Sequence, residues 1–202
     1  MSSTHVTRRL AAAATLVTAA ALATPVTTAQ TKGQPERYVA MAVNMSNVGR
    51  SGAATVEIAV NRWSTDAERD KLMTTLLEQG PEKLLKVLQD LPRVGYFRTP
   101  NSVGYDLHFA RKTPLPDGGE RVVLATDRRV GFWEAVNRPR SIDYPFTIVE
   151  MRLNRDGEGE GKMSLATKIT ADAESKTIVL EDYGTQPVLL TSVKRERTKD
   201  TK

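Results

Sequence analysis

One histidine near a carboxylate is the closest approach to a catalytic pair in this sequence. Asp106 and His108 lie in a stretch that alternates between apolar and polar residues, so both project from one face if the stretch is a strand. A carboxylate that orients an imidazole would make a general base. The chain has no cysteine and no serine between glycines at a strand-to-helix turn, so the serine, cysteine and zinc hydrolase templates lack their parts. We predict no catalytic residue and no cofactor.

The acidic stretch 154–161 has the composition of a calcium-binding loop. It holds three carboxylates between glycines, and carboxylate oxygens are ligands that Ca²⁺ prefers. A helix-loop-helix site also requires a glutamate six residues after its central glycine, and Leu165 occupies that position after Gly159. The pattern favours a flexible acidic hairpin turn between two strands. We predict no metal site.

Arginines and aromatic residues gather between residues 96 and 146. Eight of the eleven aromatic residues lie there, and arginines lie on both sides of Phe132 and Trp133. Guanidinium groups bind anions through forked hydrogen bonds and stack on aromatic rings, so the combination suits an anion with an apolar body, such as an acyl lipid or an aromatic acid. The candidate ligand-binding residues are Arg128, Arg129, Trp133, Arg138, Arg140 and Tyr144.

A structural alternative exists for the same segment. Phe132 and Trp133 could enter the core while the arginines pair with nearby carboxylates such as Asp127, Glu134 and Asp143. The two alternatives predict different exposures for Trp133.

The amino-terminal residues 1–29 have the layout of an export signal. Arg8 and Arg9 precede an apolar stretch that is too short for a stable membrane span, and small residues up to Ala29 offer a cleavage site. No later run has the length of an integral membrane span. We therefore expect a periplasmic or extracellular protein, cleaved near Ala29, whose fold is stabilised by burial because no disulfide can form.

Charge bears on the class of partner. The precursor has a net charge of +5, but residues 30–193 hold equal numbers of basic and acidic residues. Nucleic-acid binding requires a concentrated basic face, so we predict no nucleic-acid partner. Residues 30–193 have the size of a single globular domain, and residues 194–202 read as a charged, disordered tail.

One helical pair, at about residues 65–91, interrupts the chain. Thr65 and Glu68 have the spacing of a capping box, and leucines then recur at spacings of three and four on one face. Gly80 and Pro81 predict the end of one helix and the start of the next. The apolar faces must be buried, either as a structural layer on a sheet or as a movable lid over a cavity.

The rest of the chain reads as about eight short strands with polar or glycine-rich connections. The expected strands include 38–45, 56–60, 103–110, 122–126, 146–153, 163–170, 177–181 and 188–193. This pattern predicts a mainly β, α+β fold: an antiparallel meander that forms a barrel, a half-barrel or a curved sheet. The helical pair would pack on one face or across one end.

Three runs carry a resemblance to a known group of proteins. They are Leu124-Ala125-Thr126-Asp127-Arg128-Arg129, Phe132-Trp133-Glu134 and Asp143-Tyr144-Pro145-Phe146. In these runs the chain resembles an uncharacterised family of exported bacterial proteins, over most of its length after the signal. The resemblance implies export and carries no activity.

These features favour an exported, soluble, non-enzymatic binding protein that holds a hydrophobic or amphipathic anionic ligand, lipidic or aromatic, in a curved sheet closed by the helices. The alternative is a cell-envelope interaction or scaffold protein that binds another protein. An enzyme of unrecognised type is a third hypothesis.

Overall fold

The structure is a computed structural model, and it describes residues 33–44, 52–128, 147–165, 168–172, 177–181 and 188–196. The helices are α1 (Asp66–Gln79) and α2 (Pro81–Asp90). The strands are β1 (Glu36–Asn44), β2 (Gly52–Val60), β3 (Gly95–Arg98), β4 (Tyr105–Pro114), β5 (Glu120–Thr126), β6 (Thr147–Leu153), β7 (Glu158–Leu165), β8 (Lys168–Asp172), β9 (Thr177–Glu181) and β10 (Val188–Glu196).

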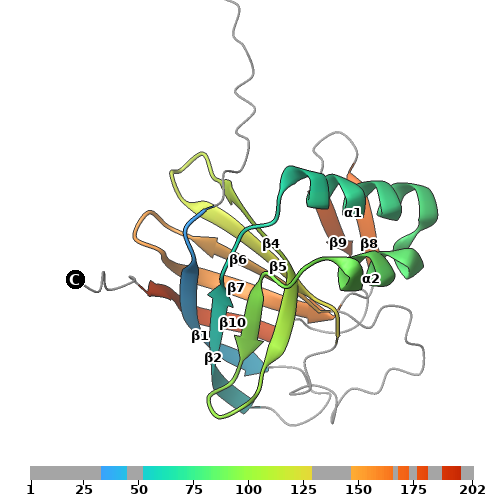
Figure 1. Cartoon of the computed structure of the whole chain (residues 1–202). Coiled ribbons are helices and arrows are strands. Elements are labelled where there is room, and N and C mark those ends of the chain that lie inside the picture. Colours follow the sequence, from blue (N-terminus) through green and yellow to red (C-terminus); the bar gives the residue numbers. More distant parts are fainter. Residues whose placement is uncertain are drawn as a thin grey trace, which may run out of the picture.

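Eight of these strands form a closed antiparallel barrel. Strands β2 to β7 follow one another as a meander, β10 continues it beside β7, and β1 closes the ring between β10 and β2. Strands β8 and β9 pair with each other as a separate two-stranded sheet (Figure 1). The predicted mainly β fold with an inserted helical pair is confirmed, and the curved sheet is a barrel.

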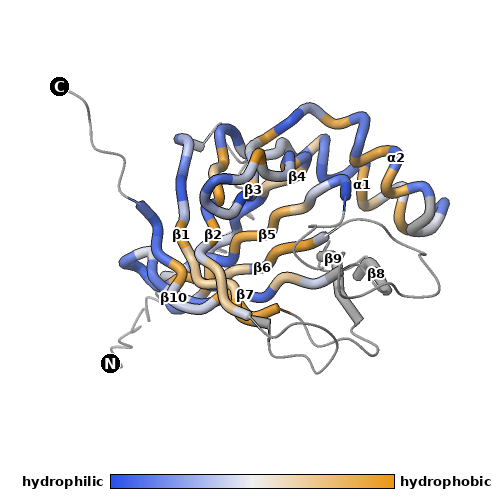
Figure 2. The backbone as a smooth tube through the Cα atoms, turned by 90° about the horizontal axis from the view of Figure 1, so that it is seen from below, coloured by the Kyte–Doolittle hydropathy of each residue, from blue (hydrophilic) through white to orange (hydrophobic). Residues whose placement is uncertain are grey.

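Alternation along the strands divides an inner face from an outer face. On β1, Tyr38, Ala40 and Ala42 are buried while Met41 between them is exposed. Apolar residues recur along the strands, and β5 and β6 carry long hydrophobic stretches (Figure 2). The inner core includes Val56, Ile58, Phe97, Leu107, Val122, Leu124, Val149, Met151, Leu190 and Val193.

Local chemistry explains where the two helices begin and end. The Thr65 hydroxyl accepts a hydrogen bond from the Glu68 amide, and the Glu68 carboxylate accepts from the Thr65 amide, so the predicted capping box is present. Gly80 lies between the helices with φ of 81°, a left-handed conformation that costs glycine little. Pro81 occupies the start of α2.

The helical pair packs on the outer wall of the barrel. Leu72 and Leu76 of α1 and Leu84 and Leu88 of α2 form one buried cluster with outward residues of three strands, namely Phe109 of β4, Ala125 of β5 and Ile148 of β6. In Figure 1 the helices lie beside the barrel, with β8 and β9 next to them. They therefore form a layer on one face, as one of the two predicted arrangements requires.

A β-bulge allows β4 to contribute side chains both to the inner core and to the cluster under the helices. The register between β4 and β5 shifts between Leu107 and Phe109, so Leu107 faces the interior while Phe109 faces the helices. His108 lies at the bulge itself. Its position there was not foreseen from the alternating pattern.

Several strand boundaries differ from the prediction. The four-residue β3 was missed because it is short and begins with a glycine. Gly95 is required there because a Cβ would lie 1.9 Å from the Ala59 carbonyl oxygen of β2. The predicted strand 163–170 is instead divided between β7 and β8, which belong to different sheets.

Two further boundaries, those of the acidic turn and of β10, also differ from the prediction. The acidic turn is confined to residues 154–157, so Glu158 and Glu160 belong to β7. Strand β10 continues to Glu196 and pairs with β1, so Lys194, Arg195 and Glu196 are strand residues in a stretch expected to be a tail.

Candidate functional site

The interior of the described barrel is filled by side chains. Leu107, Leu124, Met151 and Leu190 come from four different strands, and each has 0 % of its surface exposed. A cavity that held even one water molecule would leave part of its lining accessible. The interior around these four side chains therefore offers no room for a ligand, which leaves the ends of the barrel and its outer surface as candidate sites.

The two ends of the barrel differ in their connections. At the turn end, short turns at 115–119 and 154–157 join β4 to β5 and β6 to β7, and residues 61–94, whose helices pack on the outer wall, join β2 to β3. At the loop end lie the connections 45–51, 99–104, 127–146 and 166–187. Long connections positioned by a rigid barrel are the usual carriers of binding residues, so the loop end is the better candidate.

An ionic cluster fills the turn end. It consists of Glu36, Lys112, Glu120 and Arg195, which come from four strands and lie on their inner faces. Glu36 pairs with Lys112 and with Arg195, whose Nε lies 3.4 Å away, and Arg195 also pairs with Glu120. The cluster holds two charges of each sign.

Tyr38 contacts the ionic cluster from the interior of the barrel. Its hydroxyl donates a hydrogen bond to Glu36, and burial together with this carboxylate raises the pKa of the tyrosine. The Lys112 ammonium also lies 4.9 Å from the centre of the Trp63 ring. The charges are matched within the cluster, so it closes this end of the barrel and offers no net charge to a ligand.

Arg128 is the predicted site residue that the described chain includes. It follows β5 at the loop end, its side chain is 72 % exposed, and its Nε lies 3.6 Å from Asp127 Oδ1. Arg129, Trp133, Arg138, Arg140 and Tyr144 lie outside the described residues, in the connection between β5 and β6.

The two ends of that connection are held together at the barrel. The Thr126 hydroxyl donates to the carbonyl oxygen of Arg128, and it accepts from the Thr147 amide at 3.4 Å. Thr126 and Thr147 are almost fully buried. Arg128 is therefore fixed by its backbone while its guanidinium reaches solvent.

The carboxylate that faces His108 is Asp127 rather than Asp106, its neighbour in the sequence. Asp106 pairs instead with Arg93 at 2.7 Å, with both side chains about half exposed. His108 Nε2 lies 3.9 Å from Asp127 Oδ1, and His108 Nδ1 lies 2.8 Å from the carbonyl oxygen of Leu91. Because a carbonyl only accepts, the geometry assigns a proton to Nδ1.

This arrangement favours anchoring over catalysis. His108 ties β4 to the end of α2, and Asp127 lies between an imidazole and a guanidinium. The Arg128 charge near Asp127 disfavours a metal cation at the same place. The residues that the structure describes contain no group of three or more potential metal-ligating side chains.

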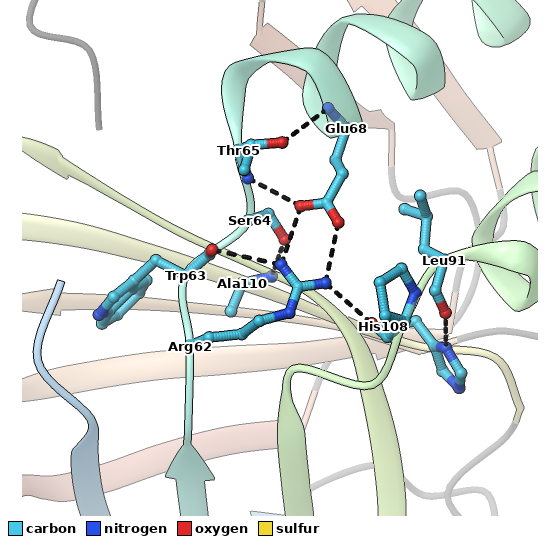
Figure 3. A network of polar contacts seen from close by, with 9 residues as sticks. Arg62, Trp63, Ser64, Thr65, Glu68, Leu91, His108 and Ala110 are labelled. Atoms are coloured by element: carbon cyan, nitrogen blue, oxygen red, sulfur yellow. Dashed lines mark hydrogen bonds and ion pairs between the residues drawn. The ribbon is translucent and has the colours of Figure 1, made fainter. Parts of the chain in front are cut away.

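A second set of polar contacts fastens the helical pair to the barrel (Figure 3). Arg62 donates to both carboxylate oxygens of Glu68, at 2.8 and 3.0 Å, and to the carbonyl oxygen of Pro92 at 3.2 Å. The start of α1 is thereby joined to the end of α2. We call Arg62, Glu68 and the Pro92 carbonyl the helix clamp.

Ser64 connects the helix clamp to strand β4. Its amide donates to the Ala110 carbonyl at 2.8 Å, and its hydroxyl accepts from the Ala110 amide at 3.0 Å (Figure 3). The base of the helical pair is thus fixed by hydrogen bonds while its face is fixed by the leucine cluster. A structural layer explains these contacts better than a movable lid.

The acidic stretch has the geometry of a turn. The Asn154 side-chain oxygen accepts from the amides of Asp156 and Glu158, at 2.9 and 3.0 Å, and the Glu158 carboxylate pairs with Lys194. This confirms the hairpin interpretation.

Among the helices in the described ranges, none is long and apolar enough to cross a membrane.

Comparisons with protein-family models, with curated proteins and with solved structures find no match to this chain. The resemblance to an exported bacterial family therefore stays a prediction, and the functional argument depends on the geometry alone.

Proposed function

We propose that this is an exported, non-enzymatic binding protein that binds an anionic amphipathic ligand at the loop end of the barrel. The observation that carries the proposal is the contrast between the two ends. The turn end is closed by a charge-matched ionic cluster, while the loop end presents the exposed guanidinium of Arg128 on a fixed backbone.

The chemistry of Arg128 suits a carboxylate or phosphate head group. A guanidinium offers five N–H donors. Among the described residues Arg128 contacts Asp127 at 3.6 Å, and its side chain is 72 % exposed, so most donors face solvent. Arg129, Arg138 and Arg140 would add positive charge from the same connection. Trp133 and Tyr144 would stack on the apolar body of the ligand.

A cell-envelope interaction or scaffold protein is the second candidate. It is favoured by the filled interior together with apolar side chains on the outer face of the barrel, where Met41 and Leu189 are more than one third exposed. This candidate requires no small ligand.

The test is a fluorescence titration of the purified protein with a fatty acid and with a lysolipid. The Trp63 side chain is 3 % exposed and donates its indole N–H to the Gln34 carbonyl, so we expect its emission to stay constant. A change on titration would then come from Trp133, and Trp133→Phe should abolish it.

The chain offers a matched control for Arg128. Arg152 is 69 % exposed, and its Nε also lies 3.6 Å from a carboxylate oxygen, that of Glu150, but it lies on β6 near the turn end. We expect Arg128→Ala to weaken binding roughly tenfold, which corresponds to one lost charge-assisted contact, and Arg152→Ala to leave it unchanged. Equal effects of the two variants, or the absence of binding at micromolar amphiphile, would reject the ligand and favour the scaffold.

A further inference from the structure

The outer face of β1 lies on the far side of the barrel from the helices. In the closed strand order β1 is four strands from β5 in either direction, and β5 lies at the centre of the wall that the helices cover (Figure 1). Met41 on β1 and Leu189 on β10 are 39 % and 38 % exposed, so two of the four exposed large hydrophobic residues in the described chain lie here.

The residues beside β1 are arranged in matching pairs. Val39, Met41 and Val43 point outward along the strand. Met41 has Thr55 of β2 on one side and Thr191 of β10 on the other, and Val43 has Ala53 and Leu189 in the same positions. A threonine is matched by a threonine, and an apolar residue by an apolar residue.

The residues that pair in register with Val39 across the neighbouring strands form a row. In this row, opposite charges lie at equal distances on the two sides of β1. Glu57 of β2 and Lys194 of β10 flank Val39 directly, and the next strands add Arg98 beside Glu57 and Glu158 beside Lys194. From β3 to β7 the row therefore reads positive, negative, apolar, positive, negative.

The charged side chains in this row remain accessible. Arg98 and Glu57 pair at 2.6 Å, Lys194 and Glu158 pair at 3.1 Å, and each of the four side chains is at least 36 % exposed. They can therefore meet a second surface without first losing their partners.

From this pattern we infer that the β1 face binds a second copy of the chain, with a two-fold axis that lies parallel to β1. A symmetric dimer uses the same patch on both copies, so that patch must be complementary to itself. Rotation about such an axis exchanges the two sides of β1. It brings Glu57 of each copy opposite Lys194 of the other.

The curvature of the barrel agrees with the residue types. Two convex walls approach most closely along β1 and separate on either side. Adjacent strands lie about 5 Å apart, so the gap is narrow at the apolar residues of β1 and wider at the flanking charges, which are long side chains. Because the barrel is closed, its eight strands offer no free edge for strand addition, and contact between faces is the available mode.

The experiment measures self-association of the purified protein by analytical ultracentrifugation over a range of concentrations. We expect a monomer–dimer equilibrium that Met41→Lys, at the centre of the face, weakens at least tenfold. The control is Leu77→Lys, because Leu77 is 52 % exposed but lies on α1, away from the face. This control should dimerise as the parent does.

Two charge reversals test the axis itself. A copy with Glu57→Lys carries lysine on both sides of Val39, and a copy with Lys194→Glu carries glutamate on both sides. For each variant alone, we expect a dimer dissociation constant at least about tenfold higher than that of the parent, because like charges meet twice across the axis. An equimolar mixture should form a mixed dimer about as tightly as the parent, because both contacts then join opposite charges.

The mixture separates contacts between copies from contacts within one copy. Both reversals break an internal ion pair, and mixing cannot repair that pair. A parent that stays monomeric, a dimer that Met41→Lys leaves intact, or a mixture that fails to recover would each overturn the inference. Self-association does not require the ligand proposed above, so either proposal can fail alone.

Discussion

The helix clamp predicts a measurable coupling between Arg62 and Glu68. The guanidinium contacts both carboxylate oxygens, at 2.8 and 3.0 Å, and the two side chains are 32 % and 17 % exposed. Hydrogen bonds to charged groups contribute about 1.5–3 kcal/mol when buried, and exposed ion pairs contribute about 0.2–1 kcal/mol. For this partly exposed pair we expect about 1–2 kcal/mol of coupling in the free energy of unfolding.

The coupling should depend on pH in a defined direction. The hydrogen bond from Arg62 is the main cause of the lowered pKa of the Glu68 carboxyl, whose ordinary value is 4.5. A carboxyl with a lowered pKa in the folded state contributes its stability above the unfolded value, and this contribution is lost as the pH falls through the folded value. The coupling should therefore be complete at neutral pH and should decline as the pH falls below about 4.5.

The assay is a double-mutant cycle in urea. It compares the parent, Arg62→Ala, Glu68→Gln and the double variant at neutral pH and near pH 3. Glutamine keeps an oxygen that can accept from the Thr65 amide, so the cycle isolates the ion pair from the capping box. A parallel cycle on Arg93 and Asp106, which lie 2.7 Å apart but are each more than half exposed, should give less than about 0.5 kcal/mol. Similar couplings for the two pairs, or a Glu68 coupling that persists unchanged at low pH, would refute the reasoning.

The remaining predictions concern packing, the ionic cluster and export. Leu88→Ala should cost about 2–5 kcal/mol because Leu88 is buried against the barrel wall, whereas exposed Leu77→Ala should cost less than about 0.5 kcal/mol in the same urea melts. Arg195→Ala should cost roughly 1–3 kcal/mol, since Glu36 and Glu120 lose a shared partner, while Arg152→Ala should cost under about 1 kcal/mol; the reverse order would argue against a stabilising ionic cluster. Mass measurement of the exported protein should show cleavage after Ala29, and an intact Met1 terminus in that fraction would contradict the signal.

Features that depend on neighbouring residues were predictable from the sequence. The capping box at Thr65 and Glu68, the stop at Gly80 and the start at Pro81 involve residues within a few positions of each other, and the structure confirms all three. Alternating apolar residues also sufficed to predict strands, because the inner face of a barrel selects every second side chain, and the short connections predicted that the strands are antiparallel.

Features that depend on distant pairing were not predictable. The carboxylate near His108 depends on the pairing of β4 with β5, which brings Asp127, just after β5, within 3.9 Å of the imidazole. The ionic cluster joins residues from both ends of the sequence, and Arg195 lay in a stretch that appeared to be a solvated tail. Neither arrangement has a sequence signal, because single residues at strand ends meet only after the barrel has closed.

The ligand-binding residues remain a prediction from composition. Arg128 lies where the hypothesis requires an exposed cation, and its backbone is fixed through Thr126. The other members of the proposed site follow it in the same connection between β5 and β6. What the sequence could not indicate is that the interior of the barrel is filled, since the inward side chains of one strand are packed by those of the opposite wall.

Native mass spectrometry of the protein isolated from the medium or envelope of its own host tests the central claim most directly. The account predicts that the parent and Arg152→Ala retain a co-purified anionic amphiphile, while Arg128→Ala arrives largely without it. A parent that carries no small molecule, or an amphiphile that Arg128→Ala retains as fully as Arg152→Ala does, would contradict the claim that the loop end of the barrel binds such a ligand.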